Sequence, residues 1–167
     1  MDFQKALIAE FDRETDKTRK FLEAIPADAD FTYKPHPKSM SLGRLAGHIA
    51  ETPGDWALSV LTTPGMEFPA GFKFEPYIPA SKQAMLEKYD LQVATSKAAL
   101  ASFKPENWEE HWKFVSGGTA WVDDTKHRVF RDMILNHLIH HRAQLGVYLR
   151  LLNQPIPGTY GPSADES

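Results

Sequence analysis

Three histidines, His137, His140 and His141, lie close together in a proline-free stretch from Thr125 to Leu152. The apolar residues of this stretch recur at helical spacing, which predicts an amphipathic helix. At about 100° per residue, His137 and His141 fall within the apolar stripe, and His140 falls outside it. The periodicity therefore predicts that His137 and His141 face inward and that His140 faces outward.

The spacing of His137 and His141 suits a metal ion. Imidazoles one helical turn apart have Cβ atoms about 5–6 Å apart and can reach one ion from the same side. Neutral imidazole is the commonest protein ligand for first-row divalent metals. The alternative is a pair of hydrogen-bonded histidines in the core. Because the pair is not an HExxH motif, it does not by itself indicate a hydrolytic metal site.

The composition limits the ligands and partners that this chain can use. The 167 residues include no cysteine, which excludes disulfides, thiolate metal sites and cysteine nucleophiles. Any metal must therefore be held by His, Asp or Glu. The net charge is −3, and the basic residues are scattered singly, so we expect no contact with nucleic acid.

The chain has no pattern typical of a membrane or secreted protein. No run approaches the ~18 uninterrupted apolar residues of a spanning helix. The N-terminal segment mixes charged and apolar residues and lacks the apolar core of a signal peptide. We therefore expect a cytoplasmic protein that does not contact membranes.

A second predicted helix carries His48. Ser41 is a good N-cap for a helix that continues to Leu61, with Pro53 and Gly54 inside its apolar pattern. Either this helix kinks at the proline or two shorter helices meet there, and a kink is favoured. His48 lies at the edge of the apolar stripe, so the periodicity permits it to face a cleft but does not require this.

Two more helices complete the prediction. Asp2–Leu22 has apolar residues at helical spacing, and Ser81 caps a third helix that ends before Pro105. The long connection Thr62–Ala80, rich in aromatic residues, is predicted as a loop of the kind that often covers a site. Residues around Gly117–Gly118 suggest a short β-hairpin before the last helix. The predicted fold is an all-α four-helix bundle with a site between its helices.

Four motifs, in this order, carry a resemblance to a known family. They are SLGRLAGHIAETPGDW (Ser41–Trp56), the WKFVSGG segment, NHLIHHRAQLGVYLR (Asn136–Arg150) and PIPGTYGPSADE (Pro155–Glu166). The chain resembles the DinB/YfiT-like superfamily of metal-dependent enzymes over essentially its whole length. The resemblance implies a single domain over residues 1–167, a four-helix bundle with up-down-down-up connectivity, and a divalent metal bound by three histidines.

Carried over position by position, the three metal ligands of the family fall on His48, His137 and His141. Two of them coincide with the pair that the helical periodicity turns inward. The other candidates for a third ligand have no motif support; they are His36, His111 and His127.

Three protein ligands leave an open coordination position, as in catalytic metal sites. Zinc or nickel suits imidazole ligands, with manganese or iron as alternatives. Relatives in the superfamily include transferases and isomerases that use low-molecular-weight thiols such as bacillithiol, mycothiol or glutathione. The resemblance thus implies a metal-dependent, thiol-dependent S-transferase that acts on a small molecule and forms a homodimer.

Two other functions stay open at this point. One is a non-catalytic, stress-related bundle that binds a metal or a small ligand. The other is a metal-dependent hydrolase, which needs a general base within reach of the metal-bound water. Glu51 and Asp55 are the nearest candidates for that base, and the sequence assigns no catalytic residue.

The surroundings of the ligands can also be predicted. A metal-bound imidazole usually donates its second N–H to an oxygen acceptor, which fixes its orientation. Helical geometry makes Thr52, Asp55 and Gln144 the candidates for these acceptors. Arg142 lies away from the centre of the stripe and is expected to pair with a carboxylate of a neighbouring helix rather than to bind an anion.

Overall fold

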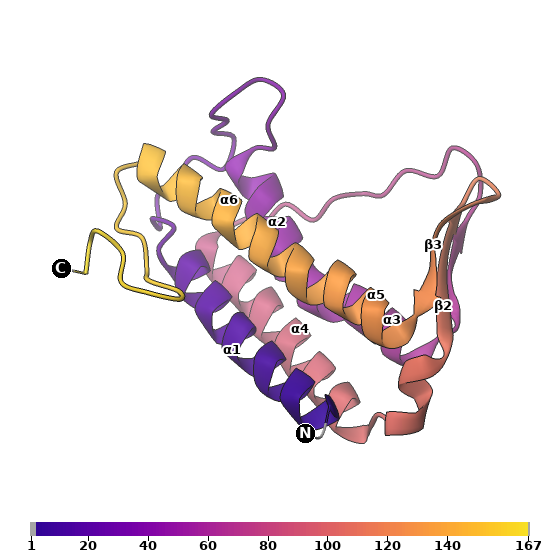
Figure 1. The fold of residues 1–167 in the computed structure, drawn as a ribbon. Helices are drawn as coiled ribbons and strands as arrows, with labels where there is room; N and C mark the ends of the chain where they lie inside the picture. The colour runs from indigo at the N-terminus through magenta and orange to yellow at the C-terminus, as the bar shows by residue number, and fades with distance from the viewer. Residues whose placement is uncertain (1–2, 167) are drawn as a thin grey trace.

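The computed structural model describes residues 3–166 and shows a mostly helical chain with a small sheet at one end (Figure 1). Its helices are α1 (Phe3–Glu23), α2 (Leu42–Glu51), η1 (Thr52–Trp56), α3 (Ala57–Thr62), α4 (Lys82–Ser102), η2 (Pro105–Glu109), α5 (Lys126–Phe130), η3 (Arg131–Asn136) and α6 (His137–Leu151). The strands are β1 (Gly65–Phe68), β2 (His111–Ser116) and β3 (Thr119–Thr125). Because α2, η1 and α3 follow one another without a break, as do α5, η3 and α6, they form two long segments beside α1 and α4.

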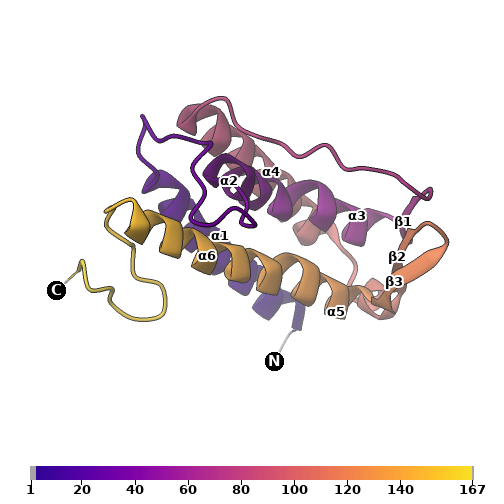
Figure 2. The same ribbon diagram turned by 90° about the horizontal axis from the view of Figure 1, so that it is seen from above.

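These four helical segments lie side by side (Figure 1, Figure 2) and run up, down, down and up in chain order. The start of α1 meets the end of α4, where the Gln4 side chain donates to the carbonyl oxygens of Leu100 and Phe103. The end of α6 meets the start of α2, where the Tyr148 hydroxyl donates to the carbonyl oxygen of Met40 at 2.8 Å. This connectivity is the one that the resemblance implied.

The predicted helix starts at Ser41 and Ser81 are confirmed. Each serine hydroxyl accepts a hydrogen bond from the backbone N–H three residues later, at 3.1 Å, which satisfies a donor that has no partner within the helix. The first helix ends one residue beyond the predicted Leu22. Its predicted start, Asp2, lies outside the described residues.

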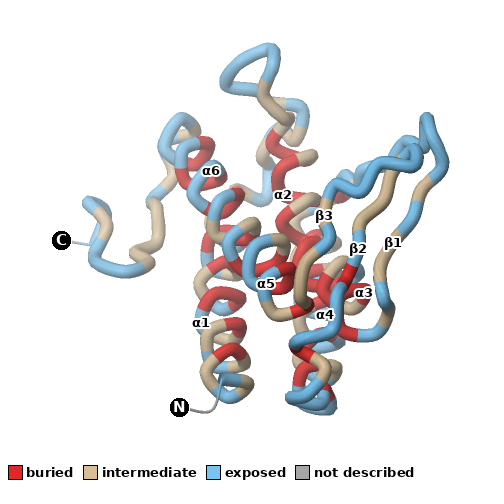
Figure 3. Tube along the Cα trace, turned by 45° about the vertical axis from the view of Figure 1, so that its right-hand side comes forward, coloured by how far each residue is buried: buried red, intermediate tan, exposed pale blue. Residues whose placement is uncertain are grey.

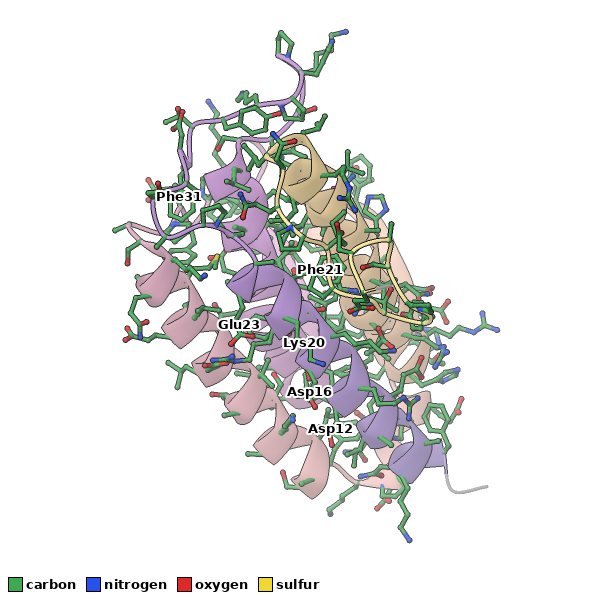
Figure 4. The ribbon with its side chains drawn as sticks, turned by 90° about the vertical axis from the view of Figure 1, so that its left-hand side faces the viewer. Asp12, Asp16, Lys20, Phe21, Glu23 and Phe31 are labelled. Atoms are coloured by element: carbon green, nitrogen blue, oxygen red, sulfur yellow. The ribbon has the colours of Figure 1, made fainter. Side chains whose placement is uncertain are left out.

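Buried residues recur along each of the four helical segments, and exposed residues predominate in the loops (Figure 3). The buried apolar residues form two clusters, one around Ile49, Tyr89 and Leu138 and the other around Phe11 and Phe130. Figure 4 shows Phe21 on the side of α1 that faces α6, while Asp16, Lys20 and Glu23 lie on the exposed side. Among the described residues, no helix is long and apolar enough to cross a membrane.

The strands form a mixed three-stranded sheet in the order β1-β2-β3. β2 and β3 are antiparallel and joined by Gly117 and Gly118, both at positive φ as a tight two-residue turn requires. β1 pairs with β2 in parallel. The fold is thus mostly helical rather than all-α, and a three-stranded sheet stands where only a short hairpin was predicted. The assignment of all of Thr62–Ala80 to a loop is wrong. The sequence could not indicate β1, because this strand is too short to show an alternation of apolar and polar residues and its partner β2 lies far along the chain.

Both histidine-bearing segments contain π-helical turns. The interruption predicted at Pro53–Gly54 takes the form of η1, where the helix widens and continues into α3. The second π segment, η3, lies in a stretch that was predicted as regular α-helix, because nothing in Arg131–Asn136 resembles a helix breaker. In both segments the extra residue per turn changes which side chains face the neighbouring helices.

Candidate metal centre

His48, His137 and His141 converge between α2 and α6. Their ligand atoms all lie within 4.8 Å of one another. The ring centroids are 4.9 Å apart for His48 and His137, 4.6 Å for His48 and His141, and 4.4 Å for His137 and His141. The Nε2 atoms of His48 and His137 are 2.7 Å apart, so one imidazole donates a hydrogen bond to the other. The structure thus brings together the three histidines that the sequence analysis selected.

Two helices that run in opposite directions position these side chains. His48 lies one turn before η1 on the α2 segment, and His137 directly follows η3 at the start of α6. His141 follows one turn later and is buried, with 6% of its surface exposed. The inward orientation predicted from periodicity is confirmed, as is the exposure of His140. Single π turns are frequent at functional sites, and here they flank two of the three histidines.

Burial keeps these imidazoles neutral. Burial, together with repulsion from a protonated His141, lowers the pKa of His48 to about 3 and that of His137 to about 4. Burial also lowers the pKa of His141, against a hydrogen bond with Gln144 that raises it, and the charge of Arg44 lowers the pKa of both His48 and His141. Neutral imidazole is the form that binds a metal, so no proton has to be removed at neutral pH.

Gln144 orients one of the imidazoles. Its Oε1 atom accepts a hydrogen bond from Nδ1 of His141 at 2.8 Å, which leaves Nε2 of His141 free to act as a ligand. Its Nε2 atom lies 3.0 Å from Nε2 of His140, to which it donates. His140 therefore positions the side-chain amide of Gln144, which in turn orients the His141 ring. The sequence analysis identified Gln144 but missed this role of His140, although a spacing of four residues between them permits it.

The other two residues proposed to orient the ligands have different partners. The Thr52 hydroxyl donates to the backbone carbonyl of His48 at 2.7 Å. A carboxylate oxygen of Asp55 accepts a hydrogen bond from Nε2 of Gln92 at 3.4 Å. In the part of the chain that the structure describes, neither side chain hydrogen-bonds an imidazole. Both nevertheless lie at the site, because they line cavities that reach His48.

Two cavities adjoin the histidines. One of about 90 Å³ is lined by His48, Thr52, Trp56, Met133 and His137. The other, of about 490 Å³, lies along α2 and is called the α2 cleft below. Its walls are formed by α2, η1, β1 and the segment that follows β1, namely Arg44, His48, Glu51, Asp55, Trp56, Met66, Phe68, Phe74, Glu75 and Pro76. His48 lines both cavities, so the histidine cluster is accessible to a small molecule.

The remaining candidates for a metal ligand lie elsewhere. Nδ1 of His36 accepts from the backbone N–H of Lys38 at 3.1 Å, and Nδ1 of His111 lies 2.8 Å from a carboxylate oxygen of Asp123 in the sheet. Nδ1 of His127 lies 3.1 Å from the Thr125 hydroxyl. None of the three joins the cluster of His48, His137 and His141.

Comparison with known proteins agrees with this architecture. A model of the DinB family matches residues 1–167. The chain belongs to the DinB family. It is 24% identical over 159 residues to an uncharacterized protein, YrdA, of Bacillus subtilis strain 168, covering 92% of this chain and 85% of that protein.

Solved structures of other DinB-like proteins have the same fold. One from Bacillus cereus ATCC 10987 superposes with a TM-score of 0.69 at 23% identity, over 93% of this chain and 97% of that chain. Another, YjoA from Bacillus subtilis, gives a TM-score of 0.65 at 17% identity, over 97% and 99% of the two chains. This DinB protein is thus a mostly helical DinB-like fold whose three clustered histidines could hold a metal.

The donor set fits a first-row divalent metal. Three neutral nitrogen donors from two helices suit zinc or nickel better than the oxygen-seeking magnesium or calcium ions. Gln144 supplies the outer hydrogen bond that metal-bound histidines ordinarily make. Since the chain has no cysteine, a thiol at such a metal would have to come from another molecule.

Proposed function

We propose that this DinB protein is a metal-dependent enzyme in which His48, His137 and His141 bind one divalent ion, zinc or nickel by preference and manganese or iron as alternatives. We further propose that it transfers a low-molecular-weight thiol, of the bacillithiol, mycothiol or glutathione kind, to a small electrophilic molecule. The observation that carries this proposal is the convergence of three neutral imidazoles beside an accessible cleft.

The cavities favour a catalytic metal over a purely structural one. Structural zinc sites are closed by four protein ligands, whereas catalytic sites have three and an open position. Among the described residues, the metal-ligating cluster has three members. The cavity of about 90 Å³ beside His48 and His137 provides room for a further ligand from solution.

The protein residues have separable tasks in the proposed transfer. A divalent ion at this site would lower the pKa of a thiol that binds it. His48, His137 and His141 hold the ion, and Gln144 keeps Nε2 of His141 directed toward it. In the reaction, the thiol sulfur forms a bond to an electrophilic carbon, the leaving group departs with its electron pair, and the thiol proton is released to water.

Metal content is the first test of this proposal. We expect near-stoichiometric metal in the wild-type protein by mass spectrometry and none in a folded variant with His48→Ala, His137→Ala and His141→Ala. The matched control is His36→Ala, which removes an exposed histidine that does not belong to the cluster. Wild-type protein that stays metal-free after incubation with zinc, nickel and manganese would contradict the proposal.

Thiol conjugation is the second test. Metal-loaded protein is incubated with bacillithiol, mycothiol or glutathione and a panel of electrophilic small molecules, and the adducts are measured by mass spectrometry. We expect metal-dependent formation of at least one adduct, and loss of that activity in the triple histidine variant. Metal binding without any conjugation would retain the metal site but exclude the transferase.

The position and the raised pKa of Glu51 favour a second candidate function, metal-dependent hydrolysis. It lines the α2 cleft with His48, and burial raises the pKa of its carboxyl group, as a general base operating near neutral pH requires. A hydrolase would cleave simple esters in a metal-dependent reaction, and Glu51→Gln would reduce the rate by about 100-fold or more. Ester cleavage that is unaffected by Glu51→Gln would exclude this role for Glu51.

A further inference from the structure

Arg44 places a positive charge in the α2 cleft, and one of its guanidinium nitrogens has no hydrogen-bond partner among the described residues. This nitrogen, Nη1, is buried. No ion pair of the described residues includes Arg44, whereas Arg19, Arg131, Arg142 and Arg150 all pair with carboxylates. A buried N–H group without a partner is costly, and the cost is removed when a ligand accepts from it.

Arg44 lies next to the histidine cluster. It precedes His48 by four residues on α2, so the two side chains are neighbours on one helix face. Both line the α2 cleft. Because the Cβ atoms of such neighbours are about 5–6 Å apart, one small molecule can contact both side chains.

The rest of the α2 cleft is unsuited to a negative charge. Glu51 and Asp55 follow His48 along the same wall, and Glu75 lies in the segment across from them. These carboxylates repel an anionic group, which is therefore directed toward the Arg44 end of the cleft. Arg44 and Lys88 both attract the carboxylate of Glu51, and of these two cations only Arg44 lines the cleft.

The wall beyond the acidic residues is apolar and aromatic. Phe74 packs against Trp56 and Phe68, with ring centroids 5.8 and 4.8 Å apart. The segment that carries Phe74 runs from β1 along α3 and α2 to the start of α4 (Figure 2). This wall offers an apolar molecule a place to lie, but it cannot solvate a carboxylate.

We propose that Arg44 binds a carboxylate on the thiol substrate, so that the preferred thiols are small mercapto acids. This inference rests on the proposed thiol-transferase function and assigns its thiol the chemical class of a carboxylic acid. The guanidinium donates charge-assisted hydrogen bonds to the carboxylate, while the sulfur reaches the histidine cluster. In this arrangement the electrophilic substrate binds against the aromatic wall.

The test compares two thiols of similar size, 3-mercaptopropionate and 3-mercapto-1-propanol. Their affinities for the metal-loaded, full-length protein are measured by calorimetry, with metal content determined for each sample. The variants are Arg44→Gln and, as the matched control, Arg13→Gln, which changes an exposed arginine of α1. Among the described residues, Nη1 of Arg44 has no hydrogen-bond partner and the side chain joins no ion pair, so Arg44→Gln breaks neither kind of contact there.

We expect the wild-type and Arg13→Gln proteins to bind 3-mercaptopropionate at least about tenfold more tightly than the alcohol, and Arg44→Gln to lose that preference. A preference that survives in Arg44→Gln would come from chelation of the metal by the carboxylate and would overturn the inference. Equal binding of both thiols to the wild type would overturn it too, while leaving the proposed function intact. Binding of neither thiol to metal-loaded protein would overturn the inference as well, and the conjugation assay with bacillithiol, mycothiol and glutathione decides separately whether the proposed function fails.

Discussion

At the scale of single residues, the metal centre depends on side chains that do not bind the metal. Gln144 lies between His140 and His141 and fixes which nitrogen of His141 faces the cluster. An imidazole without this contact can rotate or take the other tautomer, and both changes remove a ligand atom from the site. The hydrogen bond between Gln144 and His141 therefore supports metal binding, although Gln144 is not one of the three ligands.

We predict that Gln144→Leu weakens metal binding by about 10–100-fold, because His141 loses the acceptor that orients it. A competition titration with a chromophoric chelator measures the affinity. Gln83→Leu, on the exposed face of α4, is the control and should leave the affinity unchanged. An unchanged affinity in Gln144→Leu would show that packing alone orients His141.

A second residue-scale contact is a buried ion pair between α1 and α6. Nη2 of Arg142 lies 2.7 Å from a carboxylate oxygen of Glu14, and both side chains are almost fully buried. The Tyr160 hydroxyl donates to the same carboxylate at 2.7 Å. The predicted pairing of Arg142 with a carboxylate of a neighbouring helix is thus confirmed. Burial raises the pKa of Glu14, but the hydrogen bonds from Tyr160 and Arg142 outweigh it and hold the pKa below its ordinary value.

We predict that Glu14→Gln lowers the free energy of unfolding by about 3–5 kcal/mol at pH 7, because Arg142 becomes a buried charge without a counter-ion. The folded-state pKa of Glu14 is below the unfolded value, so its stabilisation is present above about pH 4.3 and is lost as the pH falls through the folded pKa. Urea denaturation at pH 7 and pH 3 should therefore show a smaller difference from wild type at pH 3. The control, Glu106→Gln, changes an exposed position and should have the wild-type stability at both pH values. If Glu14→Gln lost the same stability at pH 7 and pH 3, the ionised Glu14 carboxylate would not be the stabilising group.

At the scale of elements, the site depends on how closely the segment before α4 approaches α2. Gly47 permits this contact, since a Cβ atom there would lie 2.1 Å from the backbone oxygen of Tyr77. The obstacle is backbone and cannot move aside as a side chain could. Tyr77 directly follows Pro76, which lines the α2 cleft. A glycine on α2 therefore sets the position of one wall of that cleft.

We predict that Gly47→Ala lowers the free energy of unfolding by about 1–3 kcal/mol, because the Tyr77 segment must shift away from α2. Urea denaturation measures the loss. Gly161→Ala is the control, because nothing lies within 4 Å of a Cβ atom at that position, and we expect a change of less than about 0.5 kcal/mol. A loss of the same size in both variants would mean that the contact at Gly47 does not constrain the segment.

At the scale of the whole molecule, the histidine cluster joins two helical segments that are distant in sequence. His48 lies on the down-running α2, and its partners lie on the up-running α6. An ion held by both would bind the folded protein and not the unfolded chain, in which the three imidazoles are far apart. Such a ligand stabilises the fold by mass action.

We predict that metal at 1,000 times its dissociation constant raises the free energy of unfolding by about 4 kcal/mol. Thermal or urea denaturation with and without a chelator measures the difference. The variant lacking His48, His137 and His141 should show no response to metal or chelator. An equal response in that variant would mean that the metal acts at another site.

The homodimer expected from the family resemblance stays a prediction. Light scattering after size exclusion distinguishes the 18.9 kDa chain from a species of twice that mass. We expect the larger mass over a range of protein concentrations. A mass of one chain at every concentration would contradict the prediction.

Much of the candidate site could be predicted from the sequence, because helical geometry is local. The inward direction of His137 and His141 follows from their spacing within an apolar stripe, and the caps at Ser41 and Ser81 follow from residue type. Each of these features depends on residues within a turn or two of one another. His48 was different, since periodicity left its direction open and only the family resemblance assigned it to the cluster.

Only the tertiary structure decided the features that join distant segments. The pairing of β1 with β2 and the approach of Tyr77 to Gly47 are contacts for which no local pattern provides a signal. The same holds for Arg44, because only the packed structure shows that its Nη1 atom has no hydrogen-bond partner among the described residues. The sequence by itself determined the helices and the pair His137 and His141, because their spacing is set by the geometry of one helix. Packing determined the shape and charge of the cleft, because side chains far apart in the chain line it together.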